Sequence, residues 1–99
     1  MTQIVKLHFP HGFDERDEHE APLRGVFDQV VAILPNGREI PLVFYDPTRL
    51  AQDLSRRMQQ GEPCIAEPFL LVIPEVTQKN MQAAVDFAFD RNYFERGTD

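Results

Sequence analysis

The sequence predicts an α+β two-layer sandwich, in which a four-stranded mixed sheet carries two helices on one face. Three observations lead to this fold class. Two runs of β-branched and aromatic residues flank an Asn-Gly pair at residues 36–37, a helix-start signal follows at residues 46–48, and a second one lies at residue 77. The predicted order of elements is β-β-β-α-β-α. The 99 residues are expected to form a single domain, 1–99.

The first three predicted elements are strands. Residues 3–9 alternate loosely between apolar and polar side chains and end at Pro10 and Gly12. Residues 25–34 and 38–45 then form a hairpin around Asn36-Gly37, because this pair suits the positive φ angles of a two-residue type I′ turn. Such a turn places Leu34 opposite Glu39 and fixes the register of the whole hairpin.

This register divides the hairpin into two apolar faces. The expected core face consists of Phe27, Val31, Ile33, Ile40, Leu42 and Phe44. The second face consists of Val26, Val30, Ala32, Leu34, Val43 and Tyr45. Because two helices on one side cover only one face of a sheet, the second face is expected to meet the 10–24 loop, the chain end with Tyr93 and Phe94, or another subunit.

The remaining elements are two helices and one strand. Asp46-Pro47 predicts a helix that runs to about residue 60, since Asp caps backbone N–H groups and Pro fits the first turn. The stripe expected to face the sheet is Leu50, Ala51, Leu54 and Met58. Residues 66–73, AEPFLLVI, are apolar on both faces and predict a central, buried strand. Thr77 caps a last helix, to about Arg91, with the inner face Met81, Ala84, Val85 and Ala88, from which Phe87 points away.

The formal charge of −6 is concentrated in one segment. Five carboxylates against Arg16 give −4 between residues 14 and 20, whereas the rest of the chain carries −2. Nucleic acids and anionic membranes bind through excess Lys and Arg, so neither is expected as a partner. No apolar run is long enough for a signal peptide or a membrane span, and the protein is expected to be soluble and cytoplasmic.

The acidic segment also carries the candidate metal ligands. Residues 10–24 show neither a helical nor a strand period and are expected to form a mobile, solvated loop. His8, His11 and His19 are of the type that binds zinc, nickel or copper, but they lack a fourth ligand and a fixed scaffold. The lone thiol, Cys64, is expected to be buried or half-buried, and isolated glycines offer no phosphate-binding loop. No cofactor is predicted.

Three hypotheses of function remain open. The leading one is a non-enzymatic protein-interaction module or homodimer, motivated by excess apolar surface. The first alternative is an acidic inhibitor or immunity protein that binds a basic toxin or enzyme. The second is a small metal-dependent enzyme that uses His8, His11 and His19. The residues expected to contact a partner are Asp14, Glu15, Asp17, Glu18, Glu20, Val30, Val43, Tyr45, Phe87, Tyr93 and Phe94.

Overall fold

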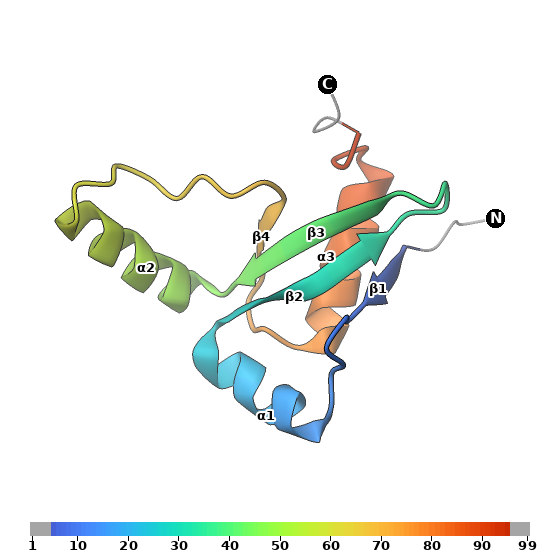
Figure 1. Cartoon of the computed structure of the whole chain (residues 1–99), viewed down its shortest axis with the longest axis horizontal. Coiled ribbons are helices and arrows are strands. Elements are labelled where there is room, and N and C mark those ends of the chain that lie inside the picture. The colour runs from blue at the N-terminus through green and yellow to red at the C-terminus, as the bar shows by residue number, and fades with distance from the viewer. Residues whose placement is uncertain (1–4, 96–99) are drawn as a thin grey trace.

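A four-stranded mixed sheet with three helices forms the protein, as described by a computed structural model for residues 5–95 (Figure 1). The strands lie in the order β1-β2-β3-β4, with antiparallel pairs except for the parallel pair β3–β4. The α+β class and the mixed sheet predicted from the sequence are therefore confirmed. In chain order the elements are β1 (Lys6–His8), α1 (Glu15–Arg24), β2 (Val26–Ile33), β3 (Glu39–Tyr45), α2 (Pro47–Gln59), β4 (Leu70–Val72) and α3 (Gln78–Asp90).

The β2–β3 hairpin forms as predicted, but its turn has three residues rather than two. The Leu34 N–H donates to the Arg38 carbonyl at 2.9 Å, and Gly37 adopts a left-handed φ of 88°. Pro35 suits the second position of a type I turn, and glycine suits the left-handed position that follows it. The predicted pairing of Leu34 with Glu39 is therefore wrong by one residue.

The corrected register changes which side chains form the core. Ala32 now pairs with Ile40, and Val30 pairs with Leu42. A β-bulge at Asp28 and Gln29 adds one residue to β2, so that Phe27 pairs with Phe44 and lies on the same face as Val30 and Ala32. The second face therefore contributes Val30, Ala32 and Leu34 to the core, where Ala21 of the 10–24 segment and Phe94 of the chain end are also buried. The largest side chains buried there are Phe44, Phe94, Leu42, Met81, Val5, Val30, Val76 and Val85.

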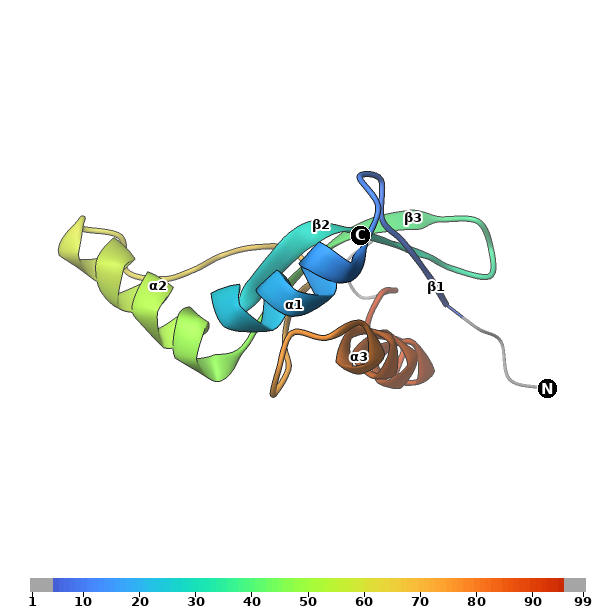
Figure 2. The same ribbon diagram turned by 90° about the horizontal axis from the view of Figure 1, so that it is seen from below.

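Helices α1 and α3 lie on this core face (Figure 2). Helix α3 buries Met81, Val85 and Ala88, which confirms its predicted inner face. Helix α1 occupies Glu15–Arg24 of the segment 10–24, which was expected to be an irregular loop. A reciprocal capping box between Asp14 and Asp17 begins it, and Gly25 ends it. Ala21 is the only residue of α1 that reaches the core.

Helix α2 begins and ends close to the predicted residues, yet it does not cover the sheet. It extends from one end of the molecule, and residues 60–69 return from its far end to β4 (Figures 1 and 2). Within the predicted inner stripe, Ala51 and Met58 are exposed, and the one buried residue of α2 is Asp53. The radius of gyration of 14.1 Å exceeds the roughly 13 Å typical of a domain of this length, as expected for a protruding helix.

Strand β4 is an edge strand, not the predicted central one. It pairs only with β3, and Leu70 and Leu71 are half-buried while Val72 is exposed. An apolar run on both faces is typical of a central strand. Here one of its faces instead borders a groove.

Candidate functional site

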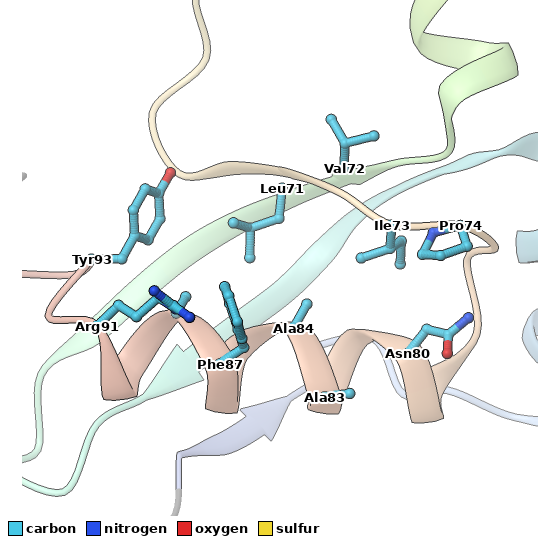
Figure 3. Close-up of a pocket in the computed structure, with 11 residues that line it drawn as sticks. Leu71, Val72, Ile73, Pro74, Asn80, Ala83, Ala84, Phe87, Arg91 and Tyr93 are labelled. Carbon is cyan, nitrogen blue, oxygen red and sulfur yellow. The ribbon is translucent and has the colours of Figure 1, made fainter.

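A groove with a volume of about 680 Å³ lies between β4 and α3 (Figure 3). Leu71 and Ile73 point from the β4 side toward α3, and Phe87 points from α3 toward β4. We call this surface the β4–α3 groove. Its lining consists of Leu71, Val72, Ile73, Pro74, Asn80, Ala83, Ala84, Phe87, Ala88, Arg91 and Tyr93.

The sequence of α3 explains why a groove forms here. Three alanines of α3 line the groove, and their side chains are too short to reach β4. At Ala83, Ala84 and Ala88 the surface of the helix is therefore set back from the strand. Phe87 lies one turn from Ala83 and Ala84 and forms a wall of the groove, with 59% of its surface exposed. A large side chain of this exposure gains little from folding. It remains available for contact with another molecule.

One end of the groove is fixed by the turn between β4 and α3. The Asn80 backbone N–H donates to the Thr77 hydroxyl at 3.1 Å, which caps α3. The Asn80 side-chain amide donates to the Glu75 carbonyl at 2.9 Å. Pro74 lies beside Asn80 at this end (Figure 3). The spacing between strand and helix is thereby set by hydrogen bonds rather than by side-chain packing alone.

An aromatic cluster closes the opposite end. The ring of Tyr93 packs edge-on against Phe69 at a centroid distance of 5.7 Å, and both contact the buried Phe94. Beside Tyr93, the guanidinium of Arg91 stacks over the Phe87 ring at 4.2 Å. Such stacking holds an arginine in place while leaving its hydrogen-bond donors free. Among residues 5–95, no carboxylate forms an ion pair with Arg91.

The free edge of β4 runs along the groove. The Phe69 carbonyl accepts from Val43 at 3.3 Å, and the Ile73 N–H donates to Tyr45 at 2.8 Å. Because alternate residues of a parallel strand bond to opposite sides, Leu70 and Val72 direct their backbone N–H and C=O groups away from β3. The Val72 side chain points away from α3, opposite to those of Leu71 and Ile73 (Figure 3). An unpaired strand edge therefore lies directly beside an apolar groove.

The lining of the groove is mostly apolar. In the described structure this lining contains no carboxylate, imidazole, thiol or amine, and the Tyr93 phenol is its one side chain of a type that serves as a general acid or base. Its polar groups are Asn80, Arg91 and Tyr93. A mostly apolar surface with a few polar groups is typical of sites that bind a ligand.

The residues expected to contact a partner are dispersed in the structure. Phe87 and Tyr93 both line the β4–α3 groove. Val30 and Phe94 lie in the core at 1% exposure, so neither can contact a partner while the fold is intact. Val43 is half-buried on the sheet face opposite the helices, and Tyr45 is buried.

Tyr45 belongs to a buried polar network that attaches α2 to the sheet. Its hydroxyl donates to Asp53 at 2.7 Å, and Asp53 also accepts from Arg49 at 2.9 Å and Arg56 at 3.0 Å. Burial alone raises the pKa of the Asp53 carboxyl, but these hydrogen bonds and the two positive charges outweigh it and hold the pKa below 3.8. Burial, followed by the hydrogen bond to Asp53, raises the pKa of Tyr45. The charges of Asp53, Arg49 and Arg56 therefore have a structural role, because they attach α2 to the sheet.

The five carboxylates of the acidic segment lie on or next to α1, and three of them have partners within the helix. Asp14 and Asp17 form the capping box, and the hydrogen bond from the Asp17 backbone keeps the pKa of Asp14 below its usual value. Glu20 binds Arg16 at 3.1 Å and Arg24 at 2.9 Å. Only Glu15 and Glu18 of this group have no partner among residues 5–95. Most of the carboxylates in the acidic segment therefore serve to stabilise α1.

The candidate metal ligands are not brought together in the described structure. His8, His11 and His19 are exposed, and residues 5–95 contain no group of three His, Cys, Asp or Glu side chains arranged to hold an ion. Cys64 is exposed in the connector between α2 and β4, contrary to the expectation of a buried or half-buried thiol. In the same range, no helix has the length and hydrophobicity needed to cross a bilayer.

Sequence reasoning missed most of the groove. The missed residues include Leu71, Ile73, Ala84 and Arg91. One local signal was present, because Phe87 lies outside the inner stripe of α3 with Ala83 one turn before it and Arg91 one turn after it. Comparisons of this chain with protein-family models, curated proteins and solved structures found no match.

Proposed function

We propose that this protein is a non-enzymatic interaction module that binds an extended segment of a partner protein. The segment adds to the sheet as a fifth strand beside β4 and inserts alternate side chains into the β4–α3 groove. The observation that carries this proposal is the free edge of β4 next to an apolar groove. Strand addition obtains affinity from backbone hydrogen bonds and specificity from pockets for alternate side chains.

The geometry of a sheet explains how one segment would use both features. An added strand lies about 4.8 Å from β4, and its backbone pairs with the outward groups of Leu70 and Val72. Side chains on one face of that strand point the same way as Leu71 and Ile73, into the groove beside Phe87. Side chains on its other face lie beside Val72, which is 50% exposed. The segment best suited to this site is apolar at both sets of positions.

A peptide partner is favoured over a second copy of the chain. In a symmetric dimer two copies with a formal charge of −6 each would meet, and their repulsion opposes close pairing. The sheet face opposite the helices, around Val31, Ile33 and Val43, is half-buried within the chain itself and so offers a second copy little exposed apolar surface. The groove, by contrast, is concave and has unpaired backbone groups along one side.

The test is a selection of binding peptides followed by hydrogen exchange. Random peptides displayed on phage are selected on the wild-type protein, and the enriched peptides are synthesised. Strand addition predicts that a bound peptide slows amide exchange at Leu70 and Val72, because these N–H groups acquire acceptors. Phe87→Ala should weaken binding at least about tenfold, since exposed aromatic side chains commonly dominate interfaces.

Leu23→Ala is the matched control. Leu23 is 76% exposed on α1 and lies outside the groove, so its removal should leave peptide affinity unchanged. Failure to enrich any peptide, or binding without protection at Leu70 and Val72, contradicts the proposal. Light scattering that shows a stable dimer with the same two amides protected would identify a second copy of the chain as the occupant instead.

A further inference from the structure

The Arg91 end of the groove carries a cation that pairs with no carboxylate of residues 5–95. In a chain of net negative charge, Arg91 forms no ion pair within the described residues, although its guanidinium is held over Phe87 at the rim of the groove. Figure 3 shows this guanidinium between the rings of Phe87 and Tyr93. An arginine fixed in this way offers paired donors to a carboxylate.

The direction of β4 determines which part of a bound peptide reaches Arg91. Strand β4 begins at the Arg91 end, where Tyr93 contacts Phe69, and it finishes at the Asn80 end, where Pro74 lies. A peptide that pairs antiparallel to β4 therefore enters beside Asn80 and directs its carboxyl end toward Arg91. Antiparallel pairs are the more common and slightly more stable arrangement.

The aromatic cluster favours a chain that stops there. The Tyr93 ring stands between the end of α3 and the chain that leads into β4, and it closes the groove at the Arg91 end (Figure 3). Phe69 has a left-handed φ of 55°, and Pro68 precedes it, so the backbone of this chain leaves the strand direction at the same point. A peptide that continued past Arg91 would meet the Tyr93 ring and would have no strand edge to pair with.

We infer that the module binds the carboxyl-terminal segment of its partner, antiparallel to β4, with the terminal carboxylate at Arg91 and apolar side chains in the groove. This inference rests on the proposed function, because it specifies which part of a partner the groove takes. Charge complementarity selects this occupant: the groove is apolar along its length, and its single cation lies where an antiparallel chain ends. The residue assigned to the carboxylate is Arg91, and the positioning residue that orients it is Phe87.

Two peptide libraries distinguish this inference from the general proposal. In one library the random segment ends in a free carboxylate, and in the other the same segment is internal to the displayed protein. The inference predicts enrichment from the first library, with apolar residues near the terminus. The best peptide is then synthesised as the free acid and as the C-terminal amide, and both are titrated against wild type, Arg91→Gln and Lys79→Gln by fluorescence anisotropy.

The expected pattern is a coupled loss. Amidation should weaken binding to wild type about fivefold to tenfold, as expected for one exposed charge-assisted contact. Arg91→Gln should weaken binding of the acid by a similar factor and leave the amide unaffected. Lys79→Gln removes an exposed cation from the far end of α3 and should change neither affinity.

Failures of the two proposals have different signatures. Equal affinity for acid and amide, or equal enrichment from the internal library, overturns the carboxyl-terminal inference and leaves strand addition standing. Loss of amide binding in Arg91→Gln also overturns it, since the arginine would then have a structural role. Absence of enrichment from both libraries overturns the proposed function and the inference with it.

Discussion

Replacing Asp53 with Asn tests whether its buried network holds α2 to the sheet. The residue is only 5% exposed and accepts hydrogen bonds from Tyr45, Arg49 and Arg56. Asn keeps the size of the side chain but removes the charge and one acceptor oxygen, which leaves the Tyr45 hydroxyl or an arginine without its partner. Hydrogen bonds to charged groups contribute about 1.5–3 kcal/mol each, and water can replace the one to Arg56, which is mostly exposed.

The expected loss for Asp53→Asn is therefore about 3 kcal/mol in the free energy of unfolding, or a fall of roughly 15 °C in Tm for a domain of this length. Tyr45→Phe removes only one of the three contacts and should cost about 1.5 kcal/mol. Arg56→Gln is the control, because an exposed ion pair contributes less than about 1 kcal/mol. Urea unfolding monitored by circular dichroism measures all three variants and the double variant of Tyr45 and Asp53.

The pH dependence gives an independent check of the same network. The folded-state pKa of Asp53 lies below its unfolded value of about 3.8, so its contribution is fully present above that pH and is lost as the pH falls through the folded-state pKa. The stability difference between wild type and Asp53→Asn should accordingly narrow below about pH 4. Two results would refute the reasoning. One is a loss of unfolding free energy in Asp53→Asn no larger than that in Arg56→Gln. The other is a stability difference between wild type and Asp53→Asn that stays constant as the pH falls below about 4.

Two further predictions concern the junction of α1 with α2 and the assignment of the aromatic residues. Gly25→Ala should destabilise the protein by at least about 2 kcal/mol, because the added Cβ would lie 2.7 Å from both the Asp46 carboxylate and the Arg49 Cβ, at a φ of 72°. Gly37→Ala, at a φ of 88° with open space around the new Cβ, should cost only about 1 kcal/mol of backbone strain, and equal losses in urea unfolding would contradict the steric argument. Phe94→Ala should cost about 3–5 kcal/mol because the ring is buried, whereas Phe87→Ala should change stability by less than about 0.5 kcal/mol. A thermal melt in which both variants unfold alike would show that Phe87 is also part of the core.

Features encoded by a few neighbouring residues could be predicted from the sequence. Asp46 and Thr77 were both identified as helix caps, because a capping side chain bonds to backbone groups three residues away. The inner face of α3 was also predicted, since its apolar spacing repeats every turn. In the hairpin, the Asn36-Gly37 pair outweighed Pro35 in the prediction, although Pro35 favours the three-residue loop that forms.

Helix α1 was missed for a physical reason. It buries only Ala21, so no apolar period marks it, and its stability comes from caps and ion pairs. The signals that could have predicted it were Asp14 and Asp17 at capping-box spacing and Gly25 at the other end.

The groove required information that is not local. Whether β4 lies in the centre or at the edge of the sheet depends on strand order, which no stretch of the chain encodes by itself. Likewise, whether Arg91 has an ion-pair partner depends on where the fold places the carboxylates of distant elements, and none of those in residues 5–95 pairs with it.

The protruding α2 and its connector have a consequence for how the edge strand is held. To pair β4 with β3, the chain must close the loop formed by residues 46–69, at an entropic cost on the order of 3 kcal/mol. The hydrogen bonds of a three-residue strand offset little of this entropic cost. The burial of Ile73 and the packing of α3 must therefore supply the remaining stabilisation of β4. The edge that a partner would use is thus held partly by contacts outside the sheet, and a bound strand on its far side would slow its local opening.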